Sequence, residues 1–284
     1  MKDFIILGGD LRFIYAAAKL NKEYSCGIYG FDKLEEPVIP ILPKIEPAKN
    51  VILPLPMSRS CDYITAPYCS VQMPIVQTVI DAAAENAVIY CGKACPVLHE
   101  ICKEKGFTLV DYFEREELTV VNAAITAEGA VEIIMREKAK AIMGMSILVT
   151  GYGRISKVLS GHLHALGAKV TVCARKFSDL AWARIMGCKA IHIDDIDLVL
   201  SNFDCIANTI PAPIFNCERL SLCKKDCLIL DLASKPCTDC MRQSDVCVIW
   251  ALSLPGKVAP ISAGEIIADT ILNIIAEGGG NNEK

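Results

Sequence analysis

Residues 147–176, ILVTGYGRISKVLSGHLHALGAKVTVCARK, restrict the fold of this chain more than any other segment. An apolar run reaches Gly151 and Gly153, a helical pattern follows, and a second apolar run ends at Arg175 and Lys176. The order strand, glycine turn, helix, strand is typical of a dinucleotide-binding unit, in which the helix N-terminus faces a pyrophosphate. Ser156 stands at the third glycine position, where a small residue still allows the helix to pack on the strand.

Apolar runs alternate with helical patterns along nearly the whole chain, which predicts an α/β fold. We expect two Rossmann-like, doubly wound parallel-sheet domains joined by a long helix, with the C-terminal helix returning to the first domain. The expected parts are a substrate domain at 1–120, a connecting helix at 121–144, a nucleotide-binding domain at 145–258, a helix at 259–277 and a disordered tail at 278–284.

The composition excludes several classes of protein. Apolar residues make up 52% of the chain and charged residues 22%, and the net charge of −4 disfavours a nucleic-acid binder. No apolar run approaches the roughly 18 residues of a membrane span, and the first apolar run is too short for a signal peptide, so we expect a soluble, cytoplasmic protein.

The 15 cysteines are expected to be reduced thiols that serve as small apolar residues. Cys237 and Cys240 form a CxxC pair with Cys247 nearby, but no second pair or histidine cluster completes a zinc site. We therefore predict no metal.

The glycine turn and the strand ends define the expected cofactor site. A carboxylate at the end of the second strand would bind a ribose 2′-hydroxyl, whereas a cation there can hold a 2′-phosphate, which favours NADP over NAD. The alternative is that both cations merely lie at an exposed strand end. The expected cofactor-binding residues are Gly151, Tyr152, Gly153, Arg154, Ile155, Ala174, Arg175, Lys176, Thr209, Pro211, Leu232 and Ala233.

Three further turns, GGDLR, DLASKP and LPGKVAPISAG, each follow a strand and carry a cation. Each can be explained as a turn with its helix cap, but three cationic turns at strand ends suggest a substrate with carboxylates. The expected substrate-binding residues are Asp10, Arg12, Ser234, Lys257, Ser262, Ala263 and Gly264, with Asp10 and Arg12 projecting into an inter-domain cleft. None of His162, His164 and His192 has a paired acid at motif spacing, and the stretch VIWALSLPGKVAP contains no histidine, which disfavours an ordinary 2-hydroxyacid dehydrogenase.

The segments GGDLR, NAAITAEGA, GYGRISK, DLASKP and ALSLPGKVAPISAG together resemble the family of the dipicolinate synthase A subunit, over essentially the whole chain. This chain departs from the family pattern at Ser156, Cys237 and Thr238, where glycines are usual. The resemblance implies oxidation of a dihydrodipicolinate to pyridine-2,6-dicarboxylate with NADP⁺ in the mother cell of a sporulating bacterium. It also implies that the partner is a flavoprotein-like B subunit, and we expect a homo-oligomer.

On this resemblance, Arg12, Lys235 and Lys257 would hold the substrate carboxylates. Lys235, Glu128 and Thr126 are the candidate catalytic residues, and Thr126 and Glu128 could position water or accept a proton. Two alternatives remain open. One is another NADP-linked dehydrogenase of a cyclic or one-carbon substrate, and the other is a nucleotide-binding scaffold that regulates the B subunit without chemistry of its own.

Overall fold

The computed structural model describes residues 1–240 and 246–278 and divides into two compact units. The first unit comprises Met1–Val121 together with the chain from Ala259 onwards, and the second comprises Asn122–Val258. Most of the tail expected to be disordered, residues 279–284, lies outside the described residues.

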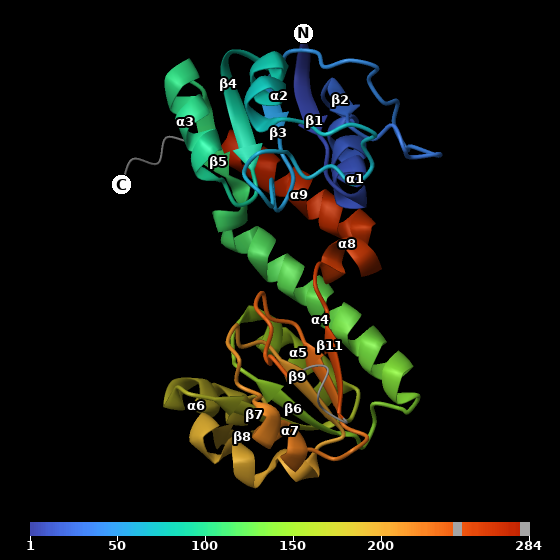
Figure 1. The fold of residues 1–284 in the computed structure, drawn as a ribbon, viewed down its shortest axis with the longest axis vertical. Coiled ribbons are helices and arrows are strands. Elements are labelled where there is room, and N and C mark those ends of the chain that lie inside the picture. Colours follow the sequence, from blue (N-terminus) through green and yellow to red (C-terminus); the bar gives the residue numbers. More distant parts are fainter. Residues whose placement is uncertain (241–245, 279–284) are drawn as a thin grey trace. The chain divides into compact units, whose positions relative to one another are not determined.

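The first unit is built on a five-stranded parallel sheet (Figure 1). Its strands are β1 (Lys2–Leu7), β2 (Cys26–Tyr29), β3 (Ala48–Ile52), β4 (Ala83–Cys91) and β5 (Thr108–Asp111), in the spatial order β2-β1-β3-β4-β5. The helices are α1 (Leu11–Leu20), α2 (Ile75–Ala82), α3 (Pro96–Lys105) and α9 (Pro260–Ala276), with a 3₁₀ turn at Tyr112–Glu114. The strand order reverses between β1 and β3, as in doubly wound sheets of the flavodoxin type.

The C-terminal helix α9 packs against α1, although about 250 residues separate them along the chain. Ile267, Ala268 and Ile271 of α9 lie in the same apolar core as the buried residues of α1. The two backbones approach so closely that a Cβ on Gly264 would lie 2.2 Å from the carbonyl oxygen of Arg12. The expected return of the last helix to the first domain is confirmed.

The second unit has a six-stranded parallel sheet with the order β11-β10-β9-β6-β7-β8, which is the Rossmann order (Figure 1). Its strands are β6 (Ser146–Thr150), β7 (Lys169–Ala174), β8 (Lys189–His192), β9 (Cys205–Asn208), β10 (Leu228–Asp231) and β11 (Cys247–Trp250). The helices are α5 (Arg154–Ala165), α6 (Phe177–Ile185), α7 (Cys217–Leu222) and α8 (Leu254–Val258), with 3₁₀ turns at Ile193–Leu198 and Leu200–Asn202. The prediction of two parallel-sheet α/β domains is confirmed.

Helix α4 (Glu116–Lys138) runs from the first unit into the second. It begins earlier than the expected 121–144 and ends at Lys138, because Ala139 adopts a left-handed conformation with φ of +47°. By length and composition α4 could cross a membrane. However, Leu118 lies in the first core and Ala127 and Ile134 lie in the second, so we interpret it as a core helix of a globular protein.

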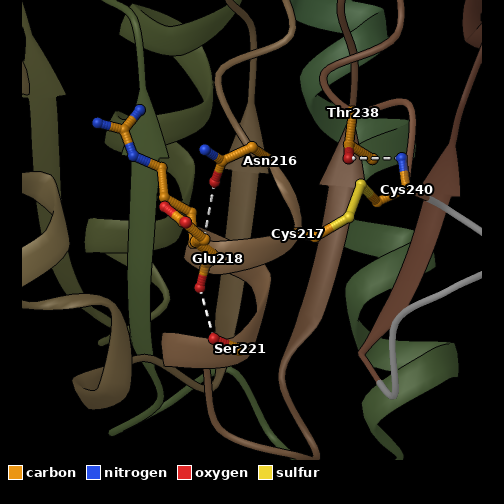
Figure 2. Close-up of a disulfide and its surroundings, with 7 residues drawn as sticks. Asn216, Cys217, Glu218, Ser221, Thr238 and Cys240 are labelled. Atoms are coloured by element: carbon orange, nitrogen blue, oxygen red, sulfur yellow. Dashed lines mark hydrogen bonds between the residues drawn. A yellow bond between two sulfur atoms is a disulfide. The ribbon is translucent and has the colours of Figure 1, made fainter.

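The expectation that every cysteine is a free thiol is wrong. Cys217, the first residue of α7, forms a disulfide with Cys240 in the loop after β10, with a Cα–Cα distance of 5.8 Å (Figure 2). Cys237 of the CxxC pair is a buried free thiol. The sequence spacing did not reveal this pairing, because the fold itself brings the two loops together: the amide of Phe215 donates a hydrogen bond to the carbonyl of Cys237.

Candidate functional site

The candidate site lies at the carboxyl edge of the second sheet, where the strand order reverses between β6 and β9. Ligands of open α/β sheets bind at such switch points, outside the carboxyl ends of the strands. The loops after β6, β7, β9 and β10 all begin at this edge, since the strands are parallel. They carry most of the predicted nucleotide-binding residues.

The turn after β6 requires glycine at its first position. Gly151 has φ of +88°, and a Cβ there would lie 2.5 Å from the hydroxyl of Thr209. That hydroxyl donates to the carbonyl of Thr150 at 2.8 Å and lies 2.6 Å from Oγ of Ser156. Ser156, which replaces the usual third glycine, is fully buried, and its hydroxyl therefore ties α5 to the loop after β9.

The first turn of α5 is open to an anion. Gly153 is the N-cap of α5, and within residues 1–240 and 246–278 no side chain caps the helix and no atom outside the local chain lies within 4 Å of a Cβ placed on Gly153. A helix N-terminus without a side-chain cap, following a glycine turn, is the arrangement that binds a dinucleotide pyrophosphate in Rossmann domains. In the first unit, by contrast, the carboxylate of Asp10 caps α1 by accepting a hydrogen bond from the amide of Arg12.

A buried polar network connects three strand ends of the site, and we did not predict it from the sequence. The hydroxyl of Thr150 donates to Oδ1 of Asn208 at 2.6 Å, and Nδ2 of Asn208 donates to Oδ1 of Asp231 at 2.8 Å. All three residues are fully buried. Their only sequence signal is that polar residues end otherwise apolar strands, which marks them as hydrogen-bonded without identifying their partners.

Asp231 also fixes the loop that carries Lys235. Its carboxylate accepts hydrogen bonds from the amide of Ala233 at 3.1 Å and from the amide of Cys237 at 2.7 Å. The carbonyl of Ala233 accepts a hydrogen bond from the indole of Trp250 at 2.8 Å. Within this anchored loop, the side chains of Ser234 and Lys235 are exposed to solvent.

The end of β7 presents two exposed cations, Arg175 and Lys176. His192, at the end of the neighbouring strand β8, donates from Nε2 to the carbonyl of Arg175 at 2.9 Å in the corresponding tautomer. The ring of Phe177 stacks on that of His192 with a centroid distance of 5.3 Å. This support holds the backbone of Arg175, while its side chain keeps the exposed position that a 2′-phosphate site needs.

Several predicted cofactor-binding residues can contribute only through the backbone. Tyr152, Ala174, Leu232 and Ala233 are buried, and burial raises the pKa of the Tyr152 phenol. The amide of Leu232 already donates to the carbonyl of Asn208. The remaining predicted residues at this edge, Arg154, Ile155, Thr209 and Pro211, are at least partly exposed.

The candidate catalytic residues of α4 show no special environment. The hydroxyl of Thr126 donates to the carbonyl of Asn122, one turn earlier in the helix, and Glu128 is exposed. A half-buried threonine with a backbone bond and a solvated glutamate are ordinary features of a helix surface. Neither the hydrogen bond of Thr126 nor the exposure of Glu128 favours a role in proton transfer.

In the first unit, Arg12 is only 7% exposed and is already engaged. Its guanidinium donates twice to the carboxylate of Asp10, at 2.8 and 2.9 Å, and to the carbonyl of Leu55 at 2.6 Å. Arg12 thus bridges the loops after β1 and β3, and these three bonds use three of the five N–H donors of its guanidinium.

The predicted residues around the start of α9 divide into two groups. Lys257 of α8 and Ser262 of α9 are exposed, with Lys257 in the second unit and Ser262 in the first. Ala263 and Gly264 are buried against α1, and the amide of Ala263 donates to the carbonyl of Ala259. These two residues therefore serve the packing of α9, and their amides are not available at its N-terminus.

A family model, a related protein and two solved structures that resemble this chain all carry the same description. A family model described as the N-terminal domain of the dipicolinate synthase A subunit matches residues 3–113. The dipicolinate synthase A subunit of Bacillus subtilis (strain 168) is 30% identical over 284 residues, covering 96% of this chain and 95% of that protein. The crystal structure of the dipicolinate synthase A subunit from Bacillus halodurans is 28% identical, with a TM-score of 0.85 and coverage of 96% and 97%. The A chain of dipicolinate synthase from Bacillus subtilis gives a TM-score of 0.83 at 28% identity, with coverage of 96% and 95%.

Proposed function

Because the chain belongs to the family of the dipicolinate synthase A subunit, we propose that it oxidises a dihydrodipicolinate to dipicolinate with NADP⁺. The observation that carries this proposal is the glycine turn and the N-terminus of α5 at the Rossmann switch point, which no side chain of the described residues caps, with Arg175 and Lys176 exposed at the end of β7. The helix N-terminus can bind a pyrophosphate, and the two cations can bind a ribose 2′-phosphate.

The nucleotide would lie across the carboxyl edge of the second sheet. The Gly151–Gly153 turn and the amides of α5 would hold the pyrophosphate, and Arg175 with Lys176 would hold the 2′-phosphate. The loops after β9 and β10, which include Thr209 and Ala233, would flank the nicotinamide half. When bound, NADP⁺ supplies the acceptor for a hydride from the dihydropyridine ring.

The protein's own contribution would be orientation of a planar diacid. Lys235 and Ser234 stand exposed in a loop that Asp231 anchors, so they can pair with one substrate carboxylate at a fixed position. The ring loses a hydride and a proton as it becomes aromatic, and this aromatisation favours product. Lys235 would thus act mainly by charge and position, and Arg12, Lys257 and Ser262 remain predictions for further carboxylate contacts.

The relatives are named as the A component of a synthase, which supports a complex with at least one further component. We propose that the partner is a flavoprotein-like B subunit and that the chain works in the cytoplasm of a sporulating mother cell. A homo-oligomer remains part of the same proposal.

Calorimetric titration with NADP⁺ and NAD⁺ tests the cofactor assignment. The wild-type chain should bind NADP⁺ more tightly, and Arg175→Asp should weaken NADP⁺ binding about 10- to 100-fold, as expected for loss of a charge-assisted bidentate contact. Binding of NAD⁺ should change little. Arg184→Asp is the matched control, because it makes the same charge change at an exposed position on α6. Equal weakening of both nucleotides by Arg175→Asp would refute the 2′-phosphate role.

A further inference from the structure

The disulfide between Cys217 and Cys240 joins the two loops that border the candidate site. Cys217 begins α7, eight residues after Thr209, and Cys240 lies five residues after Lys235. Figure 2 shows the bond between these two segments, with Thr238 accepting a hydrogen bond from the amide of Cys240 at 3.0 Å. The bond therefore restrains the chain just after Cys237, whose amide donates to the carboxylate of Asp231.

The bond is accessible to small thiols. Cys217 is exposed and Cys240 is half-buried. All 15 cysteines fall within the described residues; the other 13 are free, and 11 of them are buried. A chain that keeps nearly all its cysteines as thiols does not depend on a disulfide framework for its fold. A single bond at the surface, beside a functional loop, has the exposure expected of a regulatory disulfide.

Two of the free thiols in the second unit, Cys237 and Cys205, are poor competitors for this pairing. Cys237 is the nearest alternative partner in sequence, but burial, with the adjacent Asp231 carboxylate, raises the pKa of its thiol well above the usual value. Burial likewise raises the pKa of Cys205 to about 12. Because the thiolate is the form that attacks a disulfide, Cys237 and Cys205 are disfavoured as attacking groups.

We propose that Cys217 and Cys240 form a site of reversible thiol–disulfide modification that controls the substrate loop carrying Ser234 and Lys235. In opening, a thiolate of a small dithiol attacks the sulfur of the exposed residue Cys217 and releases Cys240 as a thiolate. The second thiol of the reagent then displaces Cys217, so that two electrons and two protons pass to the protein and the reagent becomes a cyclic disulfide. In closing, a glutathione-type disulfide takes up the two electrons and is released as two thiols.

The control of the loop rests on the proposed function, whereas formation of the bond does not. With the bond closed, residues 238–240 are tied to α7, directly after the loop in which Asp231 holds the amides of Ala233 and Cys237 on either side of Lys235. With the bond open, the Phe215–Cys237 hydrogen bond and both hydrogen bonds to Asp231 remain, so only the segment that follows Cys237 loses a restraint. A diacid must then order this segment on binding, and we expect its affinity to fall about two- to tenfold.

The first test counts thiols. The purified chain is equilibrated in glutathione buffers of graded redox poise, and free thiols are alkylated and mapped by mass spectrometry. We expect the two thiols of Cys217 and Cys240 to disappear together as the buffer becomes oxidising, and Cys217→Ser to abolish this change. Cys247→Ser, which removes an exposed free cysteine, should leave it intact. No joint change of the two thiols, or a bond that a dithiol cannot open in the folded protein, would overturn the proposal.

The second test measures binding of dipicolinate and NADP⁺ to the oxidised and reduced wild-type chain. Tighter dipicolinate binding to the oxidised form, together with a Cys217→Ser variant that matches the reduced form under both conditions, supports control of the loop. Equal dipicolinate affinity in both redox states overturns that control, even if the bond forms. Failure to bind NADP⁺ in either state would instead contradict the proposed function, and the thiol count would still decide whether the modification site exists.

Discussion

Replacing Asp231 with alanine tests whether the buried polar network holds the site together. Asp231 is fully buried, and its carboxylate accepts three hydrogen bonds, from the side chain of Asn208 and from the amides of Ala233 and Cys237. Asp231→Ala removes the common acceptor and leaves three donors without it. The change should therefore release the loop after β10, which carries Lys235, and also destabilise the second unit.

The magnitude follows from those contacts. A buried donor left without its partner costs about 1–3 kcal/mol. Three such donors would cost more, but removing the carboxylate also removes the cost of burying it, and water can enter the space. We therefore expect the free energy of unfolding to fall by about 3–5 kcal/mol. Asp231→Asn keeps one acceptor oxygen and should cost about 1–3 kcal/mol.

Tryptophan fluorescence during urea unfolding measures this loss selectively, because both tryptophans of the chain, Trp182 and Trp250, belong to the second unit. Trp250 also donates to the carbonyl of Ala233, so its emission reports the loop directly. Asp239→Ala is the matched control, since Asp239 is exposed in the same loop and should change stability by less than about 0.5 kcal/mol. Equal urea midpoints for Asp231→Ala and Asp239→Ala would refute the role assigned to the network.

Three further outcomes follow from the structure. Gly264→Ala should lower the melting temperature, because its Cβ would lie 2.2 Å from the carbonyl oxygen of Arg12 in α1. Gly161→Ala should be neutral or stabilising in the same calorimetric scan, because no described residue outside its own helix turn would contact the added Cβ. The hydrogen bond from Lys224 holds the pKa of Asp204 below its usual value. The pair therefore stabilises the fold fully above the usual aspartate pKa, and this stabilisation is lost as the pH falls through the lowered pKa of Asp204. Asp204→Asn should make the stability of the protein less dependent on pH in this acid range. Lys235→Ala should weaken dipicolinate binding in calorimetry and leave NADP⁺ affinity unchanged, and the opposite pattern would reassign Lys235 to the nucleotide.

The parts that could be predicted from the sequence are those encoded locally. The apolar run before Gly151 and the helical pattern after it define a strand, a turn and a helix within about 20 residues, and the structure has them there. Likewise, the amphipathic pattern of 259–277 predicts a helix with a buried face, which the structure places on α1.

The parts that could not be predicted depend on partners far apart in the chain. Asn208 and Asp231 each look like a polar residue at the end of a strand, and only the parallel pairing of β9 and β10 brings their side chains together. The disulfide joins residues separated by 23 positions, a spacing that carries no motif. The sequence suggested that Gly264 offers an amide to an anion, but the glycine faces α1, whose residues lie near the opposite end of the chain.

The most direct test of the proposed function is whether the purified chain alone reduces NADP⁺ when dihydrodipicolinate is supplied, followed by the absorbance of the reduced nicotinamide. We expect substrate-dependent formation of NADPH and dipicolinate in equal amounts, greatly reduced by Lys235→Ala and much slower with NAD⁺. Tight NADP⁺ binding without any turnover, even with dihydrodipicolinate in excess, would contradict the dehydrogenase proposal and favour a nucleotide-binding scaffold.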